Sequence, residues 1–171
     1  MSARAKENAL TEFDREFDSL RALFRTLLPD ALETPVFAAE GEGWHVRDLI
    51  PHIAVWQGRA ARAARKVAAE GLRPGPDDRV RTILGIQETA DELNDATFKE
   101  WRGRNAREQL TELGKVHQEM MGALNALTPE QLMSGEGMDS VFACFRVPGL
   151  EHLRTHRAHI EAALAKEGAK K

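Results

Sequence analysis

Cysteine is nearly absent from this sequence, since Cys144 is the only one among 171 residues. A lone thiol cannot form an internal disulfide, so the chain is suited to a reducing compartment. The sequence also lacks an apolar signal-peptide segment near its polar N-terminus, and it has no apolar run of about 18 residues that could span a membrane. These absences predict a cytoplasmic protein with no membrane contact.

Familiar catalytic motifs are missing as well. There is no recognisable Ser-His-Asp arrangement, no H-E-x-x-H zinc-protease motif and no glycine-rich phosphate loop. Basic charge is not in excess either, because the formal net charge is -3, which speaks against binding to nucleic acid. Any chemistry must therefore come from a different group of residues.

The length and composition are typical of one globular domain over 1–171, with a frayed tail from about 167. Apolar residues recur at spacings of three and four, and we find no convincing strand or repeat. The pattern predicts helices over about 5–28, 44–71, 79–100, 105–127 and 149–166, with one helical turn opened by Thr128-Pro129-Glu130. We therefore expect an all-α four-helix bundle with short additional helices.

Histidine is concentrated near the C-terminus, where His152, His156 and His159 fall within eight residues. His152 and His156 are one helical turn apart, so both rings can reach a common point, and His156 with His159 offers a second pair. His52 has a similar position at the margin of the second long helix. Two ligands from one helix and a third from its neighbour are what a metal site in a bundle needs.

The spacing of these histidines also has a simpler interpretation. A histidine pair at i and i+4 arises by chance, and the flanking Arg154 and Arg157 would suit a solvated basic face. Spacing alone leaves the metal site and the solvated face as competing hypotheses.

The segment from Gly43 to Trp56 resembles the G-W-x-V-R-D-L-x-x-H-x-x-x-W opening of the second helix in the DinB superfamily. The run from His152 to Ile160 is similar to that superfamily's last helix, which carries an H-x-x-x-H pair. The superfamily includes bacillithiol S-transferases and the N-terminal domains of mycothiol-dependent maleylpyruvate isomerases. The resemblance implies a DinB/YfiT-like bundle with His52, His152 and His156 as ligands of a divalent metal such as Ni, Zn or Fe. His159 would then lie behind the ligands or, after a register shift, replace His152.

The resemblance also implies a function. In such enzymes the metal binds the sulfur of a low-molecular-weight thiol, which attacks an electrophile, and no protein nucleophile is required. A thiol S-transferase or isomerase is therefore one hypothesis, with a homodimer expected by analogy of fold. The alternative is a non-catalytic protein that binds a small molecule or a partner in stress protection.

Other residues are weaker candidates. Cys144 is expected to be a buried thiol, and His117 is expected on the flank of its helix, not as a fourth ligand. Trp44 and Trp56 could line a pocket mouth or belong to the core. Glu151 could orient a ligand, and the basic strip on the second helix is expected to be solvated; it comprises Arg59, Arg62, Arg65 and Lys66.

Overall fold

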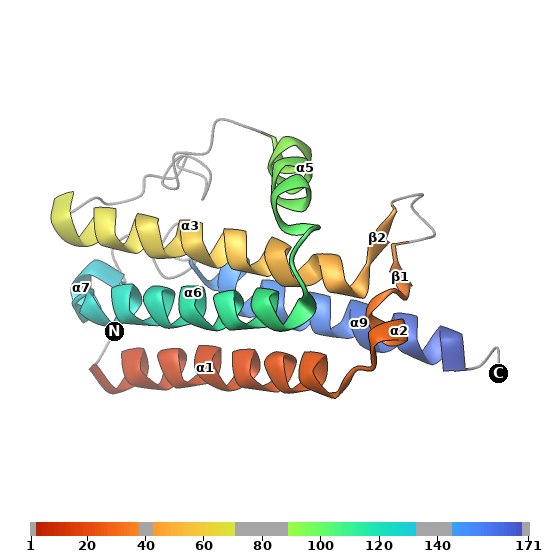
Figure 1. The fold of residues 1–171 in the computed structure, drawn as a ribbon. Coiled ribbons are helices and arrows are strands. Elements are labelled where there is room, and N and C mark those ends of the chain that lie inside the picture. The colour runs from red at the N-terminus through yellow and green to blue at the C-terminus, as the bar shows by residue number, and fades with distance from the viewer. Residues whose placement is uncertain (1–2, 38–42, 71–88, 133–144, 169–171) are drawn as a thin grey trace.

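The computed structural model describes residues 3–37, 43–70, 89–132 and 145–168. Four long helices form the body of the fold: α1 (Ala3–Thr26), α3 (Leu49–Glu70), α6 (Ala106–Ala126) and α9 (His152–Gly168). As Figure 1 shows, α1 and α9 run in one direction and α3 and α6 in the other. The prediction of an all-α bundle is confirmed.

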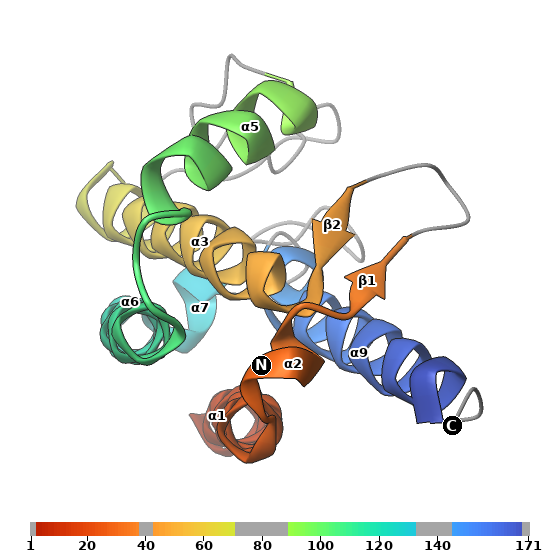
Figure 2. The same ribbon diagram turned by 45° about the vertical axis from the view of Figure 1, so that its right-hand side comes forward.

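Shorter helices complete the described part of the chain: α2 (Pro29–Leu32), α5 (Ala90–Trp101) and α7 (Pro129–Leu132), with a 3-10 turn η2 (Val46–Asp48) and a π-helical turn η4 (Val147–Glu151). α5 crosses α3 at a steep angle, on the side of α3 that faces away from α1 (Figures 1 and 2). It thereby reaches the N-terminal half of α3, where His52 lies.

The long helices form because their apolar residues recur on one face, and the expected faces are buried. α1 buries Leu10, Phe13, Phe17, Leu20 and Phe24, and α6 buries Leu113, Met120 and Leu124. Each such side chain stabilises the fold by about 1.5–3 kcal/mol when it is removed from water. Leu27 and Trp56 share the apolar spacing of their segments but are only half-buried.

Asn105 caps α6, which begins at Ala106, next to the predicted start at 105. Its side-chain Oδ1 accepts from the Glu108 backbone N–H at 3.0 Å, and the Glu108 carboxylate accepts from the Asn105 N–H at 3.2 Å. This capping box satisfies donors at both ends of the first turn, so it defines where the helix begins.

The absence of strands was predicted wrongly. Residues Pro35–Val36 (β1) and Trp44–His45 (β2) form a short antiparallel ladder, with Pro35 opposite His45 and Val36 opposite Trp44. The second long helix therefore does not begin at Trp44 or His45. Strand pairs this short carry no periodicity that a sequence pattern can detect.

The third predicted helix, over 79–100, is also corrected. Thr89 has an extended backbone and caps α5, accepting from the Glu92 N–H at 3.2 Å, so a helix continuous from 79 to 100 is excluded. Residues 79–88 lie outside the described ranges. At the C-terminus, the predicted helix over 149–166 is a π-helical turn over Val147–Glu151 followed by α9.

Candidate metal centre

His52 lies in the first turn of α3, and the residues just before it fix where that turn points. Asp48 is buried and its carboxylate Oδ2 accepts from the His45 backbone N–H at 2.9 Å, which caps η2. Val46 and Leu49 are fully buried on either side of this cap. Pro51 sits within the first turn of α3, where its missing N–H costs the helix nothing.

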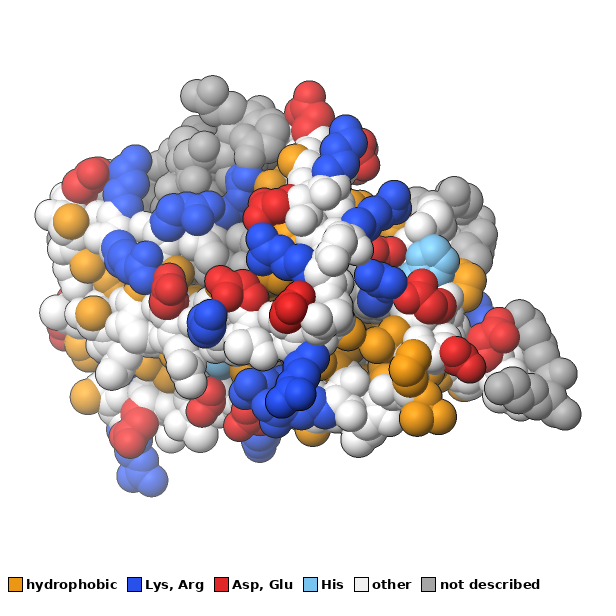
Figure 3. Space-filling model, in the orientation of Figure 1, with side chains coloured by type: hydrophobic (Ala, Val, Ile, Leu, Met, Phe, Trp, Pro, Cys, Tyr) orange, Lys and Arg blue, Asp and Glu red, His pale blue; other side chains and the backbone are white. Residues whose placement is uncertain are grey.

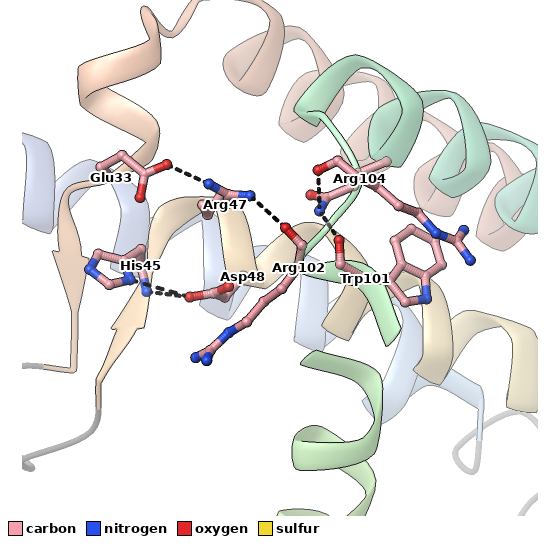
Figure 4. A network of polar contacts seen from close by, with 8 residues as sticks. Glu33, His45, Arg47, Asp48, Trp101, Arg102 and Arg104 are labelled. Atoms are coloured by element: carbon pink, nitrogen blue, oxygen red, sulfur yellow. Dashed lines mark hydrogen bonds and ion pairs between the residues drawn. The ribbon is translucent and has the colours of Figure 1, made fainter. Parts of the chain in front are cut away.

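Arg47 connects this turn to two other elements, as Figure 4 shows. Its guanidinium Nη1 pairs with the Glu33 carboxylate at 2.7 Å, and its Nη2 donates to the Arg102 carbonyl at 3.3 Å. Gln109 then ties the end of α5 to α6, since its Nε2 donates to the Trp101 carbonyl at 3.0 Å. These contacts hold α5 against the start of α3.

The other histidines lie on α9, whose placement depends on a close approach to α1. Gly149, in the π-helical turn, is so close to Phe13 that a Cβ there would lie 2.2 Å from Phe13 Cε1. On α9 itself, Arg154 pairs with Glu12 and Glu16 of α1 at 2.6 and 3.2 Å. Arg154 therefore faces α1, as does Arg157, whose Nη1 donates to Ser19 Oγ at 2.7 Å.

The ring nitrogens of three histidines converge. His152 Nε2 lies 2.8 Å from His52 Nε2 and 2.8 Å from His156 Nε2. One ligand nitrogen from each of the three residues lies within 4.8 Å of the others. His52 and His156 are buried, with 8% and 6% exposure, and His152 is half-buried. Three such nitrogens could hold a metal ion.

Asn94 of α5 determines which nitrogen of His52 is the acceptor. Its carbonyl Oδ1, which can only accept, lies 2.9 Å from His52 Nδ1, so Nδ1 carries the proton and donates. The lone pair of neutral His52 is therefore on Nε2, directed at the other two rings. An oxygen partner behind a histidine is the arrangement that fixes the ring of a metal ligand.

The distances between the nitrogens suit a small cation. Zinc–nitrogen bonds of about 2.0–2.1 Å in tetrahedral geometry place neighbouring ligand nitrogens about 3.3 Å apart. The contacts of 2.8 Å would open by about 0.5 Å, which small rotations of the side chains provide. A single His152 Nε2 meets two other nitrogens, and one proton cannot form a well-aligned hydrogen bond with both.

Burial keeps the His52 and His156 rings neutral. It lowers the pKa of His52 from its usual 6.5 to about 4, against the opposing effect of the Asn94 hydrogen bond. Burial is also the main cause that lowers the pKa of His156, and the neighbouring histidines lower it further. Only a neutral imidazole has a lone pair for a metal, so His52 and His156 are ready as donors at neutral pH.

Aromatic side chains surround the histidines. The Trp44 ring packs edge-on to His52, with ring centroids 5.1 Å apart. The Trp56 ring centroid lies 6.2 Å from that of His152 and 6.3 Å from that of His52. The buried Trp56 indole N–H has no hydrogen-bond partner among the described residues. Both tryptophans therefore border the three histidines, and Trp44 also packs against the hydrophobic core.

Phe37 adds a strained element to this wall. It is the one described non-glycine residue with positive φ, at 56°, a conformation that costs an aromatic residue free energy. Its ring packs edge-on against His159, with centroids 4.7 Å apart. His159 lies outside the converging group, so the geometry does not put it in place of His152.

The remaining candidates have other positions. His117 is not on the flank of its helix: it is buried, stacks on Phe17 at 3.6 Å, and contacts Gln57 Oε1 at 3.3 Å and Asp14 Oδ1 at 3.2 Å. Arg59 is buried, so the basic strip is solvated only at Arg62, Arg65 and Lys66. Glu151 pairs with Arg146 at 2.9 Å, and Cys144 lies outside the described residues.

Comparison with known proteins decides the family. The model of the mycothiol maleylpyruvate isomerase N-terminal domain matches residues 13–143, more than half of the chain. The chain belongs to this DinB-like family. The family match includes His52 and the Asn94 behind it, and it ends before His152 and His156, whose position rests on the structure. Searches of curated proteins and of solved structures gave no match.

The sequence analysis did not identify Asn94 or Phe37 as residues of the site, and it did not predict that Arg47 connects α2 to the end of α5. Asn94 interrupts the apolar pattern of a short helix, and asparagine is a poor helix former, which is the only local sign that this residue has a special role.

No helix among the described residues has the length and apolar character that crossing a membrane requires.

Proposed function

We propose that His52, His152 and His156 bind one divalent transition metal ion through their Nε2 atoms, with Zn, Ni and Fe as the candidates. The observation that carries the proposal is the meeting of three imidazole nitrogens from α3 and α9 around one point. The lowered pKa values of His52 and His156 and the hydrogen bond from His52 to Asn94 support it. Three protein ligands leave an open coordination position.

We further propose that the protein acts on a low-molecular-weight thiol of the mycothiol type, in an S-transfer or isomerisation reaction. Family membership supports this proposal. A divalent ion in this position would favour the thiolate over the thiol of a bound thiol, which raises its nucleophilicity at neutral pH. The chain's own residues would hold the ion, and Trp44, Trp56 and Phe37 would form an apolar wall that excludes water from the electrophile.

The metal site is tested by removing two ligands at once. We expect the double variant His152→Ala/His156→Ala, purified without a histidine tag and supplemented with Zn or Ni, to hold less than about a tenth of an equivalent by elemental analysis, because one imidazole alone binds weakly. The wild type should hold about one equivalent. His45→Gln is the matched control, since His45 lies outside the converging group and should retain the metal.

Activity is tested separately with metal-loaded protein, a panel of thiols and electrophiles such as maleylpyruvate. Turnover that needs both thiol and metal would support the enzyme. Full metal content with no turnover would leave the metal site intact and favour the non-catalytic binding protein.

Three broader expectations remain predictions. We propose that residues 1–171 form one domain, that the protein works in the cytoplasm, and that it pairs as a homodimer. Light scattering on the purified chain measures the last of these directly.

A further inference from the structure

A groove between the C-terminal end of α1, α2 and the start of α6 has only basic residues among its charged lining side chains. Its volume is about 530 Å³, within the range of small-molecule sites. Three arginines line it, Arg21 and Arg25 from α1 and Arg107 from α6, and no acidic residue does. This concentration of positive charge occurs in a chain whose net charge is -3.

The three guanidinium groups have no ion-pair partner among the residues that the structure describes. Six other arginines each pair with a carboxylate: Arg47, Arg65, Arg104, Arg146, Arg154 and Arg157. Like charges placed together repel one another, and an anion between them would relieve that repulsion.

The Arg21 side chain packs closely against α6 in this groove. Its guanidinium lies over Gly114 of α6, so closely that a Cβ there would be 3.0 Å from Nη2 and 3.2 Å from Cζ. The Arg21 Nε is buried and has no hydrogen-bond partner in the described part of the chain. The side chain is therefore held in place by packing, and one of its donors is left unused.

Apolar side chains form the rest of the lining. Leu27, Leu32 and Leu110 are half-buried along the groove. Figure 3 shows a group of basic side chains beside a hydrophobic patch in this region of the surface. Leu28, next to the groove, is 75% exposed, the largest exposure of any large hydrophobic side chain that the structure describes.

We propose that this groove binds an amphipathic organic anion, with a carboxylate held by Arg21, Arg25 and Arg107 and an apolar chain against the three leucines. Guanidinium groups match a carboxylate with paired hydrogen bonds, and the leucines gain by covering their exposed area. None of the three converging histidines lines the groove, so this site is separate from the metal centre.

The test is calorimetric titration of the full chain with sodium octanoate near neutral pH. We expect saturable binding at one site, and binding at least about tenfold weaker for acetate, which lacks the chain, and for octylammonium, which carries the opposite charge. Octyl phosphate in a parallel titration distinguishes a carboxylate site from a phosphate site, since tighter binding of octyl phosphate would reassign the head group.

The variant Arg21→Gln/Arg107→Gln should bind octanoate at least about tenfold more weakly, because two charge-assisted contacts are lost. Arg62→Gln, an exposed arginine on α3 away from the groove, should bind like the wild type. Methyl shifts of Leu27, Leu32 and Leu110 on octanoate addition locate the site in the wild type, so a poorly folded variant cannot obscure the result.

The proposal would be overturned by a lack of saturable octanoate binding, by equal binding of octylammonium, or by methyl shifts confined to other residues. A wild-type dimer that becomes monomeric in the Arg21→Gln/Arg107→Gln variant would also overturn the proposal, since the groove would then be covered by a second copy of the chain.

Discussion

Single residues determine whether the three histidines can act together, and Asn94 is the clearest example. It lies on a different element from all three histidines, yet its carbonyl oxygen at 2.9 Å decides that the His52 lone pair is on Nε2. Without it, the other tautomer of His52 would present an N–H to the remaining nitrogens. The residue is thus a positioning residue, which acts through His52.

Replacing Asn94 should therefore weaken metal binding. We expect Asn94→Ala to lower metal affinity by about 10–100-fold, the usual effect of losing the partner behind a ligand histidine. A competition titration with a chromophoric chelator measures the affinity. Asn94→Asp, which keeps an acceptor oxygen, should recover most of it. Equal affinities for Asn94→Ala and the wild type would show that His52 needs no such support.

The sequence revealed the histidines but not their supports, for a physical reason. His152 and His156 can be recognised as a pair from their helical spacing, which is a local property of the sequence. His52 can be recognised from its position on an apolar helix. Asn94 and Phe37 reach the site through tertiary packing, and nothing in their neighbourhood in the sequence encodes that. Likewise, His117 was placed on a flank because its burial depends on Phe17, Asp14 and Gln57, residues far away in the chain.

At the level of elements, the segment from Trp44 to Leu49 positions His52. Trp44 packs on the His52 ring, Arg47 links α2 to the end of α5, and Asp48 caps the turn before α3. The residues of this segment therefore hold the start of α3 and the His52 ring in position. Helical periodicity predicted α1, α3 and α6 well, and it failed at β2 because that strand is only two residues long.

The close packing of the π-helical turn η4 against α1 leads to a prediction. Gly149→Ala should destabilise the fold by about 1–3 kcal/mol, because the new methyl group would overlap Phe13 and push the start of α9 away from α1. Urea unfolding measures the loss. Metal affinity should fall with it, since His152 follows the turn directly.

Gly122→Ala is the matched control for this variant, because a Cβ at Gly122 of α6 meets nothing within 4 Å. Alanine there should leave stability unchanged or raise it by up to about 1 kcal/mol. A stable Gly149→Ala variant with normal metal affinity would mean that the approach of Phe13 does not position α9.

At the level of the whole molecule, the buried histidines couple stability to pH. The pKa of His52 is lowered to about 4, and burial also lowers the pKa of His117 and His156. In the unfolded chain these groups titrate near 6.5. As pH falls from about 6.5 toward 4, the unfolded chain takes up protons that the folded protein refuses, so the free energy of unfolding must fall.

For metal-free protein we expect the free energy of unfolding to be about 2 kcal/mol lower at pH 5 than at pH 7 from His52 alone, with further loss from the other two. Above about pH 7 these groups are neutral in both states and contribute no slope. Urea titrations across this range provide the curve. A free energy that stays level or rises on acidification would contradict the burial of neutral imidazoles.

The central claim concerns the meeting of α3 and α9 at one cation, and it is tested most directly by anomalous diffraction from crystals grown with added Zn or Ni. We predict a single strong anomalous peak about 2.0–2.1 Å from the Nε2 atoms of His52, His152 and His156. No peak among these three rings, or a peak held by His159 or by other side chains instead, would contradict it.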